Sequence, residues 1–266
     1  MKTIHANNTQ IAYQDLGSGP PLVLLHGFSL DHSMWAAQAK LLQRKYRLII
    51  PDLRGAGKTE DSAKPFSIET IAEDIAALLE ALDMESAAVA GFSMGGFILA
   101  NMLVRHPLKV RAAAFISTLG TGADDPERQE ARLKNMRFVM EEGSEAFAVS
   151  FVPRLFSPAF INSHPDEVAH TQRIIGGQRP RSLALMLDAM RQRPDLSLHL
   201  KDFVVPSVVV IGNEDPIVPV AAMRALHEGM PKSVFEIIDG AGHMTTVEAP
   251  EKVASVLDQL MQRVGV

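Results

Sequence analysis

The chain of 266 residues contains no cysteine. This absence excludes disulfides, thiolate metal ligands and a cysteine nucleophile. No apolar run approaches the roughly 18 residues needed to cross a bilayer, and residues 1–15 have no apolar core of the kind found in a signal peptide. The formal net charge of -5 provides no positive field for nucleic acid or anionic lipid. We therefore expect a cytoplasmic protein without nucleic-acid or membrane partners; its oligomeric state stays open.

The sequence also lacks complete cofactor and metal signatures. Residues 54–59 (RGAGKT) end like a P-loop, but the position that requires the first glycine is Asp52. The pairs Gly17/Gly19 and Gly240/Gly242 lack the third glycine of a dinucleotide fingerprint, and no H-E-x-x-H spacing occurs. We expect neither a cofactor nor a metal.

Hydrophobic patterning predicts alternating strands and helices. Residues 2–4 and 9–14 flank Asn7-Asn8, a pair that suits a hairpin turn. The later apolar runs are compact, which is typical of parallel strands buried on both faces. Segments with helical spacing separate these runs, so the fold class is α/β with a mostly parallel, doubly wound sheet. The expected strands are 22–25, 48–50, 87–90, 112–116, 208–211 and 234–238, and the expected helices are 34–42, 68–82, 94–105, 221–228 and 247–264.

The alternation stops between about residues 120 and 201, where no strand pattern is evident. Charged, apolar and proline-containing stretches follow one another there, which predicts a mainly helical insertion. We therefore assign residues 1–119 and 202–266 to the core and residues 120–201 to a helical insertion. The insertion has enough apolar side chains to pack on the open end of the sheet.

Ser93 is the first candidate catalytic residue. It lies in a G-x-S-x-G motif, residues 91–95 (GFSMG), directly after an expected strand and before an expected helix. A sharp turn in this position exposes the serine hydroxyl at a helix N-terminus, and the glycines remove side chains that would collide. This context favours a nucleophile over an ordinary turn serine.

A serine nucleophile needs a base and a residue that orients the base. His243 is the expected base because it lies in a glycine-rich loop between the last strand and the last helix. Asp215 follows the strand 208–211 and precedes Pro216, which keeps it out of a helix. Glu214 is the adjacent alternative. The order Ser93, Asp215, His243 is the order of α/β-hydrolases.

An oxyanion intermediate requires N–H donors. The expected donors are the backbone N–H groups of Met94, next to the nucleophile, and of Phe28, in the loop after the strand 22–25. His26, beside Gly27, is interpreted as a structural residue of that loop. Several apolar side chains adjoin these elements, and for each one core packing is an equal alternative. Those expected to line a substrate pocket are Trp35, Phe92 and Met244.

These residues resemble the α/β-hydrolase superfamily. The resemblance is carried by residues 25–28 (LHGF), 51–57 (PDLRGAG), 91–96 (GFSMGG), 212–219 and 240–250. Within the superfamily the chain is most similar to small carboxylesterases, enol-lactonases and cofactor-free haloperoxidase-like enzymes. This resemblance implies that the insertion, residues 120–201, is a helical cap inserted after the sixth strand. Ser93 replaces the aspartate nucleophile of haloalkane dehalogenases and epoxide hydrolases. Phe92 and Met244 differ from the asparagine and aromatic residue usual in carbon–carbon bond hydrolases.

The function expected from these features is hydrolysis of a small-molecule ester or lactone through an acyl-enzyme on Ser93. Carbon–carbon bond hydrolysis and perhydrolysis on the same triad are alternatives. A ligand-binding or signalling protein with a slow triad is an alternative from a different class.

Overall fold

The computed structural model describes residues 1–60, 64–119, 122–123 and 125–264. It opens with the expected hairpin, in which β1 (Lys2–Ala6) pairs antiparallel with β2 (Thr9–Leu16). The turn residues Asn7 and Asn8 have φ angles of 45° and 57°. Two residues with positive φ match the twist of a hairpin, and asparagine tolerates that conformation better than most residues.

The central sheet, within the described residues, has eight strands in the order β1-β2-β4-β3-β5-β6-β7-β8. Pairing is antiparallel from β1 to β4 through β2 and parallel from β4 onward. The middle strands are buried on both faces, which explains their continuous apolar sequences. The remaining strands are β3 (Pro21–Leu25), β4 (Arg47–Pro51), β5 (Ala87–Phe92), β6 (Val110–Ile116), β7 (Ser207–Gly212) and β8 (Ser233–Ile238).

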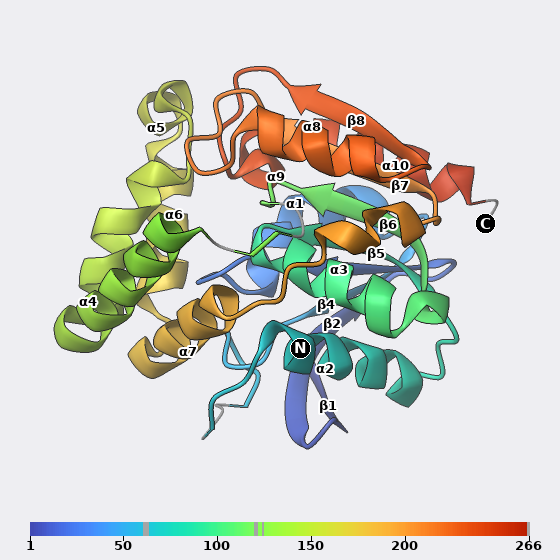
Figure 1. Cartoon of the computed structure of the whole chain (residues 1–266), viewed down its shortest axis with the longest axis horizontal. Coiled ribbons are helices and arrows are strands. Elements are labelled where there is room, and N and C mark those ends of the chain that lie inside the picture. Colours follow the sequence, from blue (N-terminus) through green and yellow to red (C-terminus); the bar gives the residue numbers. More distant parts are fainter. Residues whose placement is uncertain (61–63, 120–121, 124, 265–266) are drawn as a thin grey trace.

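Helices cover both faces of this sheet (Figure 1). On one face α1 (Ala36–Leu42) packs against α10 (Pro250–Arg263). On the other face α2 (Ile68–Ala81) packs against α3 (Met94–Arg105), and α8 (Val220–Gly229) contacts β7 and β8. The predicted doubly wound α/β fold is thus confirmed.

The predicted insertion after the sixth strand is helical. It contains α4 (Pro126–Phe151), the 3-10 turn η3 (Val152–Arg154), α5 (Pro158–Ser163), α6 (Pro165–Gly176) and α7 (Pro180–Arg191). Each of these helices starts with a proline, which the first turn accommodates because its N–H groups have no partner inside the helix. We call these elements the cap. In Figure 1 they lie on the side toward which β6 and β8 point. The division at residues 120 and 201 stays a prediction, and residue 120 lies outside the described residues.

Two expected helices differ in detail. Residues 34–42 begin with a 3-10 turn, η1 (His32–Trp35), before α1. Residues 247–264 form two helices, α9 (Thr245–Glu248) and α10, rather than one. Ala249 between them has φ -139° and ψ 59°, because the residue before a proline is disfavoured in helical conformation. In the described part of the chain, no helix has both the length and the apolar character required to span a membrane.

Candidate active site

Ser93 occupies a sharp turn between β5 and α3. Its φ of 51° and ψ of -112° are unusual for a residue with a side chain. The backbone is held there by hydrogen bonds, since the Ser93 N–H donates to Ile116 O and its carbonyl accepts from the Gly96 N–H. The hydroxyl therefore stands at the N-terminus of α3, and Ser93 lines a cavity.

The glycines around Ser93 allow this close packing. A Cβ at Gly91 would meet Gly95 O at 2.3 Å, and a Cβ at Gly95 would meet Leu25 O at 2.5 Å. Both distances involve backbone atoms, which cannot move aside as a flexible side chain could. The glycine spacing in the sequence is thus a consequence of the turn that presents the serine.

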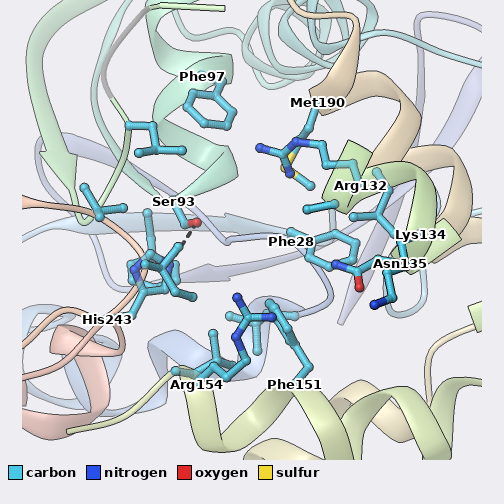
Figure 2. Close-up of a pocket in the computed structure, with 18 residues that line it drawn as sticks. Phe28, Ser93, Phe97, Arg132, Lys134, Asn135, Phe151, Arg154, Met190 and His243 are labelled. Atoms are coloured by element: carbon cyan, nitrogen blue, oxygen red, sulfur yellow. Dashed lines mark hydrogen bonds between the residues drawn. The ribbon is translucent and has the colours of Figure 1, made fainter. Parts of the chain in front are cut away.

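The three residues expected to act together are brought together by three different loops. His243 Nε2 lies 3.1 Å from Ser93 Oγ (Figure 2), and His243 Nδ1 lies 2.8 Å from Asp215 Oδ2. A carboxylate can only accept, so the imidazole donates from Nδ1 and leaves Nε2 to accept from the serine hydroxyl. This geometry is the one that serine activation requires.

Asp215 is held firmly. Its side chain is 0% exposed, and Oδ1 accepts hydrogen bonds from the N–H groups of Ile217 and Val218, both at 2.8 Å. The neighbouring Glu214 is exposed to solvent. Of the two carboxylates weighed from the sequence, Asp215 is the one that contacts His243. The ring of Phe92 lies beside the imidazole of His243, with 5.1 Å between ring centroids.

The two expected oxyanion donors follow the ends of neighbouring strands. Phe28 comes after β3, Met94 comes after β5, and β3 pairs with β5. Within the described part of the chain, neither backbone N–H donates to another group of the protein. Both donors therefore remain available to a bound oxyanion, although their role stays a prediction.

His26 has the structural place expected for it. It is fully buried, its Nε2 accepts from the Leu53 N–H at 2.9 Å, and its Nδ1 donates to Gly27 O at 2.8 Å. Burial lowers the pKa of this imidazole. His26 thus ties the loop after β3 to the loop after β4.

Among the described residues, one group has ligand atoms placed closely enough to hold a metal ion, namely Asp31, His32 and Asp52, whose ligand atoms lie within 4.8 Å of one another. Asp52 Oδ1 accepts from His32 Nδ1 at 2.7 Å and Oδ2 accepts from the Lys58 N–H at 2.8 Å. Burial raises the pKa of the Asp52 carboxyl, but these hydrogen bonds outweigh burial and the pKa is lowered. The Asp52 oxygens therefore connect the segment after β3, which carries His32, with the loop after β4, which carries Lys58.

A cavity of about 360 Å³ opens beside Ser93 and His243 (Figure 2). This volume is near the lower end of the range for small-molecule sites. The core contributes a mainly apolar wall, made of Phe28, Leu30, Phe92, Phe97, Leu119, Ile217 and Val218. The cap contributes a wall with several cationic and polar side chains, made of Ala131, Arg132, Lys134, Asn135, Phe151, Arg154, Leu155, Leu187 and Met190.

Two of the three residues expected to line the pocket lie elsewhere. Phe92 lines the cavity, but Trp35 is 0% exposed and packs in the core. Met244 lines a separate cavity of about 270 Å³ that is bounded by α6 and η1. Met244 directly follows His243, and Trp35 follows the loop of Phe28. Nearness along the chain does not determine side-chain direction, because a side chain can turn toward the core instead.

The sequence interpretation missed the cap residues of the cavity. No local pattern singled out Arg132, Lys134 or Arg154, since charged residues on a helix usually face solvent. Ile217 and Val218 could have been found, because they directly follow Asp215 on the same loop. Phe97, four residues after Ser93 on α3, also lines the cavity.

Comparisons with known proteins identify the family and agree with the fold. A family model described as the alpha/beta hydrolase fold matches residues 20–250. The chain is 26% identical over 263 residues to 3-oxoadipate enol-lactonase 2 of Acinetobacter baylyi, covering 98% of this chain and 96% of that one. A thermophilic esterase from Thermogutta terrifontis superposes with a TM-score of 0.96 at 28% identity, with all of both chains covered. An enol-lactonase from Burkholderia xenovorans shares the fold, with a TM-score of 0.92 at 23% identity over 98% of this chain and 100% of that one.

Proposed function

Because this chain belongs to the α/β-hydrolase family, we propose that it is a serine hydrolase that cleaves a small carboxylic ester or lactone. The observation that carries the proposal is the hydrogen-bonded series Asp215–His243–Ser93 at the wall of a small cavity. Relatives named as an enol-lactonase and an esterase support the class of substrate.

In the first half of the reaction, Ser93 Oγ attacks the carbonyl carbon of the bound ester or lactone. His243 Nε2 takes the hydroxyl proton as the bond forms, and Asp215 stabilises the resulting imidazolium. The negative charge that develops on the carbonyl oxygen is stabilised by the N–H groups of Phe28 and Met94. One such donor is worth about 2.7–4 kcal/mol where single donors have been removed from other enzymes.

The tetrahedral intermediate then collapses: the bond from the carbonyl carbon to the leaving oxygen breaks, this oxygen takes the proton from the imidazolium, and an acyl group remains on Ser93. In the second half, a water molecule loses a proton to His243 and attacks the acyl carbonyl. Collapse of the second intermediate returns the proton to Ser93 and releases the acid. For a lactone, the alcohol and acid are parts of one product.

Hydrolysis of a short-chain p-nitrophenyl ester tests this proposal. We expect wild type to turn over the ester and Ser93→Ala to lose at least about 10³-fold in kcat, as in other serine hydrolases whose nucleophile is removed. A fluorophosphonate probe should label the wild type and leave Ser93→Ala unlabelled. Ser255→Ala, on the exposed face of α10, is the matched control and should behave as wild type.

The same experiment separates the proposal from a ligand-binding protein with a slow triad. If wild type hydrolyses the ester no faster than Ser93→Ala, the proposed function is wrong. Labelling of Ser93→Ala to the wild-type extent would show that another residue is the reactive nucleophile.

A further inference from the structure

The cap side of the active-site cavity is cationic. Three positively charged side chains line it, namely Arg132, Lys134 and Arg154 (Figure 2). The described residues that line this cavity include no aspartate or glutamate. This local excess of positive charge contrasts with the whole chain, whose formal net charge is -5.

Arg154 lines the cavity together with Ser93 and His243. In the view of Figure 2 its guanidinium lies between His243 and Phe151. The structure describes no carboxylate within 4.0 Å of this guanidinium, and the side chain is exposed to solvent. Five N–H donors on a planar cation suit a carboxylate, which can accept two of them at once.

The position of Arg154 is coupled to the catalytic loop. The next residue, Leu155, accepts a hydrogen bond through its carbonyl from the Met244 N–H at 2.9 Å. Met244 is in turn the residue after His243. The backbone around Arg154 is therefore held at a defined distance from the imidazole.

The other two cations reach the cavity from α4. Lys134 is exposed, whereas Arg132 is partly buried and donates from a guanidinium nitrogen to Met190 Sδ at 3.4 Å. The opposite wall, made by the core, is apolar apart from the catalytic groups. A ligand that matches both walls has a small apolar body and an anionic group directed at the cap.

From this distribution we propose that the substrate is a small ester or lactone that carries a carboxylate, and that Arg154 determines the specificity by binding this carboxylate, with Lys134 in support. The inference rests on the proposed function, because it concerns the same cavity. The carboxylate can belong to the acyl part or to the alcohol part of the substrate, and the experiment below has an arm for each.

Two matched substrate pairs test the inference. Monomethyl glutarate and its carboxamide, methyl 5-amino-5-oxopentanoate, differ only in the charge on the acyl side. Likewise 4-acetoxybutanoate and 4-acetoxybutanamide differ only on the alcohol side. In at least one pair, we expect wild type to favour the anion by about tenfold or more in kcat/KM, the size of one charge-assisted hydrogen bond.

Charge-removing variants identify the residue responsible. Arg154→Gln should lose most of the preference, because KM for the anion rises about tenfold more than KM for the amide. Arg137→Gln is the matched control, because Arg137 is an exposed arginine on α4 that does not line the cavity. The inference is overturned if wild type favours the anion in neither pair, or if Arg154→Gln keeps the preference.

A binding measurement separates this inference from the proposed function. Titration of glutarate into Ser93→Ala by calorimetry requires no turnover. We expect saturable binding that weakens about tenfold in the double variant Ser93→Ala/Arg154→Gln and weakens with added salt, since an exposed charge pair is screened. If no ester is hydrolysed but glutarate binds in this way, the proposed function fails and the inferred anion site stands. Equal binding by both variants, or no binding, overturns the anion site.

Discussion

At the scale of single residues, Asp215 shows how a carboxylate is prepared to orient a histidine. It is buried, it accepts two backbone hydrogen bonds on one oxygen, and it accepts from His243 on the other. The three hydrogen bonds stabilise the negative charge of the buried carboxylate. The two backbone bonds to Oδ1 also orient the carboxylate so that Oδ2 points toward His243.

We expect Asp215→Asn to lower kcat for a p-nitrophenyl ester by roughly 10⁴-fold, because the amide can donate to Nδ1 and favours the wrong imidazole tautomer. Steady-state kinetics measures the loss. Glu214→Gln is the control, since Glu214 is adjacent but exposed, and it should retain near wild-type turnover. A larger loss in Glu214→Gln than in Asp215→Asn would contradict the assignment.

A second residue-scale pair, His32 and Asp52, makes stability depend on pH. The hydrogen bond to Asp52 raises the pKa of His32, although partial burial opposes it. The pKa of His32 is therefore higher in the folded state than in the unfolded state. Its contribution to the free energy of unfolding is complete below the unfolded pKa of about 6.5 and is lost as pH rises through the folded pKa.

We therefore expect the free energy of unfolding of His32→Gln to differ most from wild type near pH 6, with the difference shrinking toward pH 9. Urea titrations at several pH values measure it. The control is His5→Gln, which changes an exposed histidine on β1. A difference that grows with pH would contradict the sign of the pKa shift.

At the scale of elements, α4 is divided by a kink at Gly143. Its φ of 86° and ψ of 172° lie in a region that is essentially restricted to glycine. The segment before the kink carries Arg132 and Lys134, whereas the segment after it carries Phe147 and Phe151, which pack edge-on against Phe28. Because of the kink, the first segment of α4 lines the cavity with its charged side chains and the second segment packs on the core.

Gly143→Ala should destabilise the fold by about 1–3 kcal/mol, because a Cβ is strained in this conformation even though no atom lies within 4 Å of its place. Urea unfolding measures the change. Gly176→Ala is the control, since Gly176 is helical and its added Cβ would make only ordinary contacts, the nearest at 3.5 Å. A stabilising Gly143→Ala would show that the kink straightens at no cost.

At the scale of the whole molecule, the cap and the core are joined at the loop that carries His243. Glu248, at the end of α9, accepts from the Ser157 N–H of the cap and from the Gly242 N–H beside His243, both at 3.0 Å. Two backbone segments that are far apart in the chain therefore share one carboxylate. We expect the position of His243 to depend on cap packing through this residue.

Glu248→Ala should leave both N–H groups without this acceptor and lower the free energy of unfolding by about 1.5–3 kcal/mol, the range for a hydrogen bond to a charged group. It should also lower kcat more than it raises KM, because it disturbs the base rather than the cavity wall. Unfolding and steady-state kinetics measure the two effects. Glu251→Ala, an exposed change in the first turn of α10, is the control. Wild-type kcat in Glu248→Ala would contradict the coupling.

Much of the fold could be predicted because its signals are local. Asn7-Asn8 predicts a hairpin since few residues tolerate its φ angles, and continuous apolar runs predict strands that are buried on both faces. The break at Ala249 was missed, although Pro250 carried the signal. Pairing of Ser93, His243 and Asp215 was predictable because parallel strands bring the loops at their carboxyl ends to the same edge of the sheet.

By itself, the sequence determined the α/β fold class and the sharp turn at Ser93, because hydrophobic periodicity and turn residues act on the backbone within a few residues. The order of Ser93, Asp215 and His243 is part of the sequence itself. Only the tertiary structure decided which side chains line the cavity beside Ser93. Trp35 and Met244 turn away from the cavity, while Arg132, Lys134 and Arg154 reach it from the cap. The reason is physical: a helix presents side chains in all directions, and only packing against the core determines which face closes over the serine.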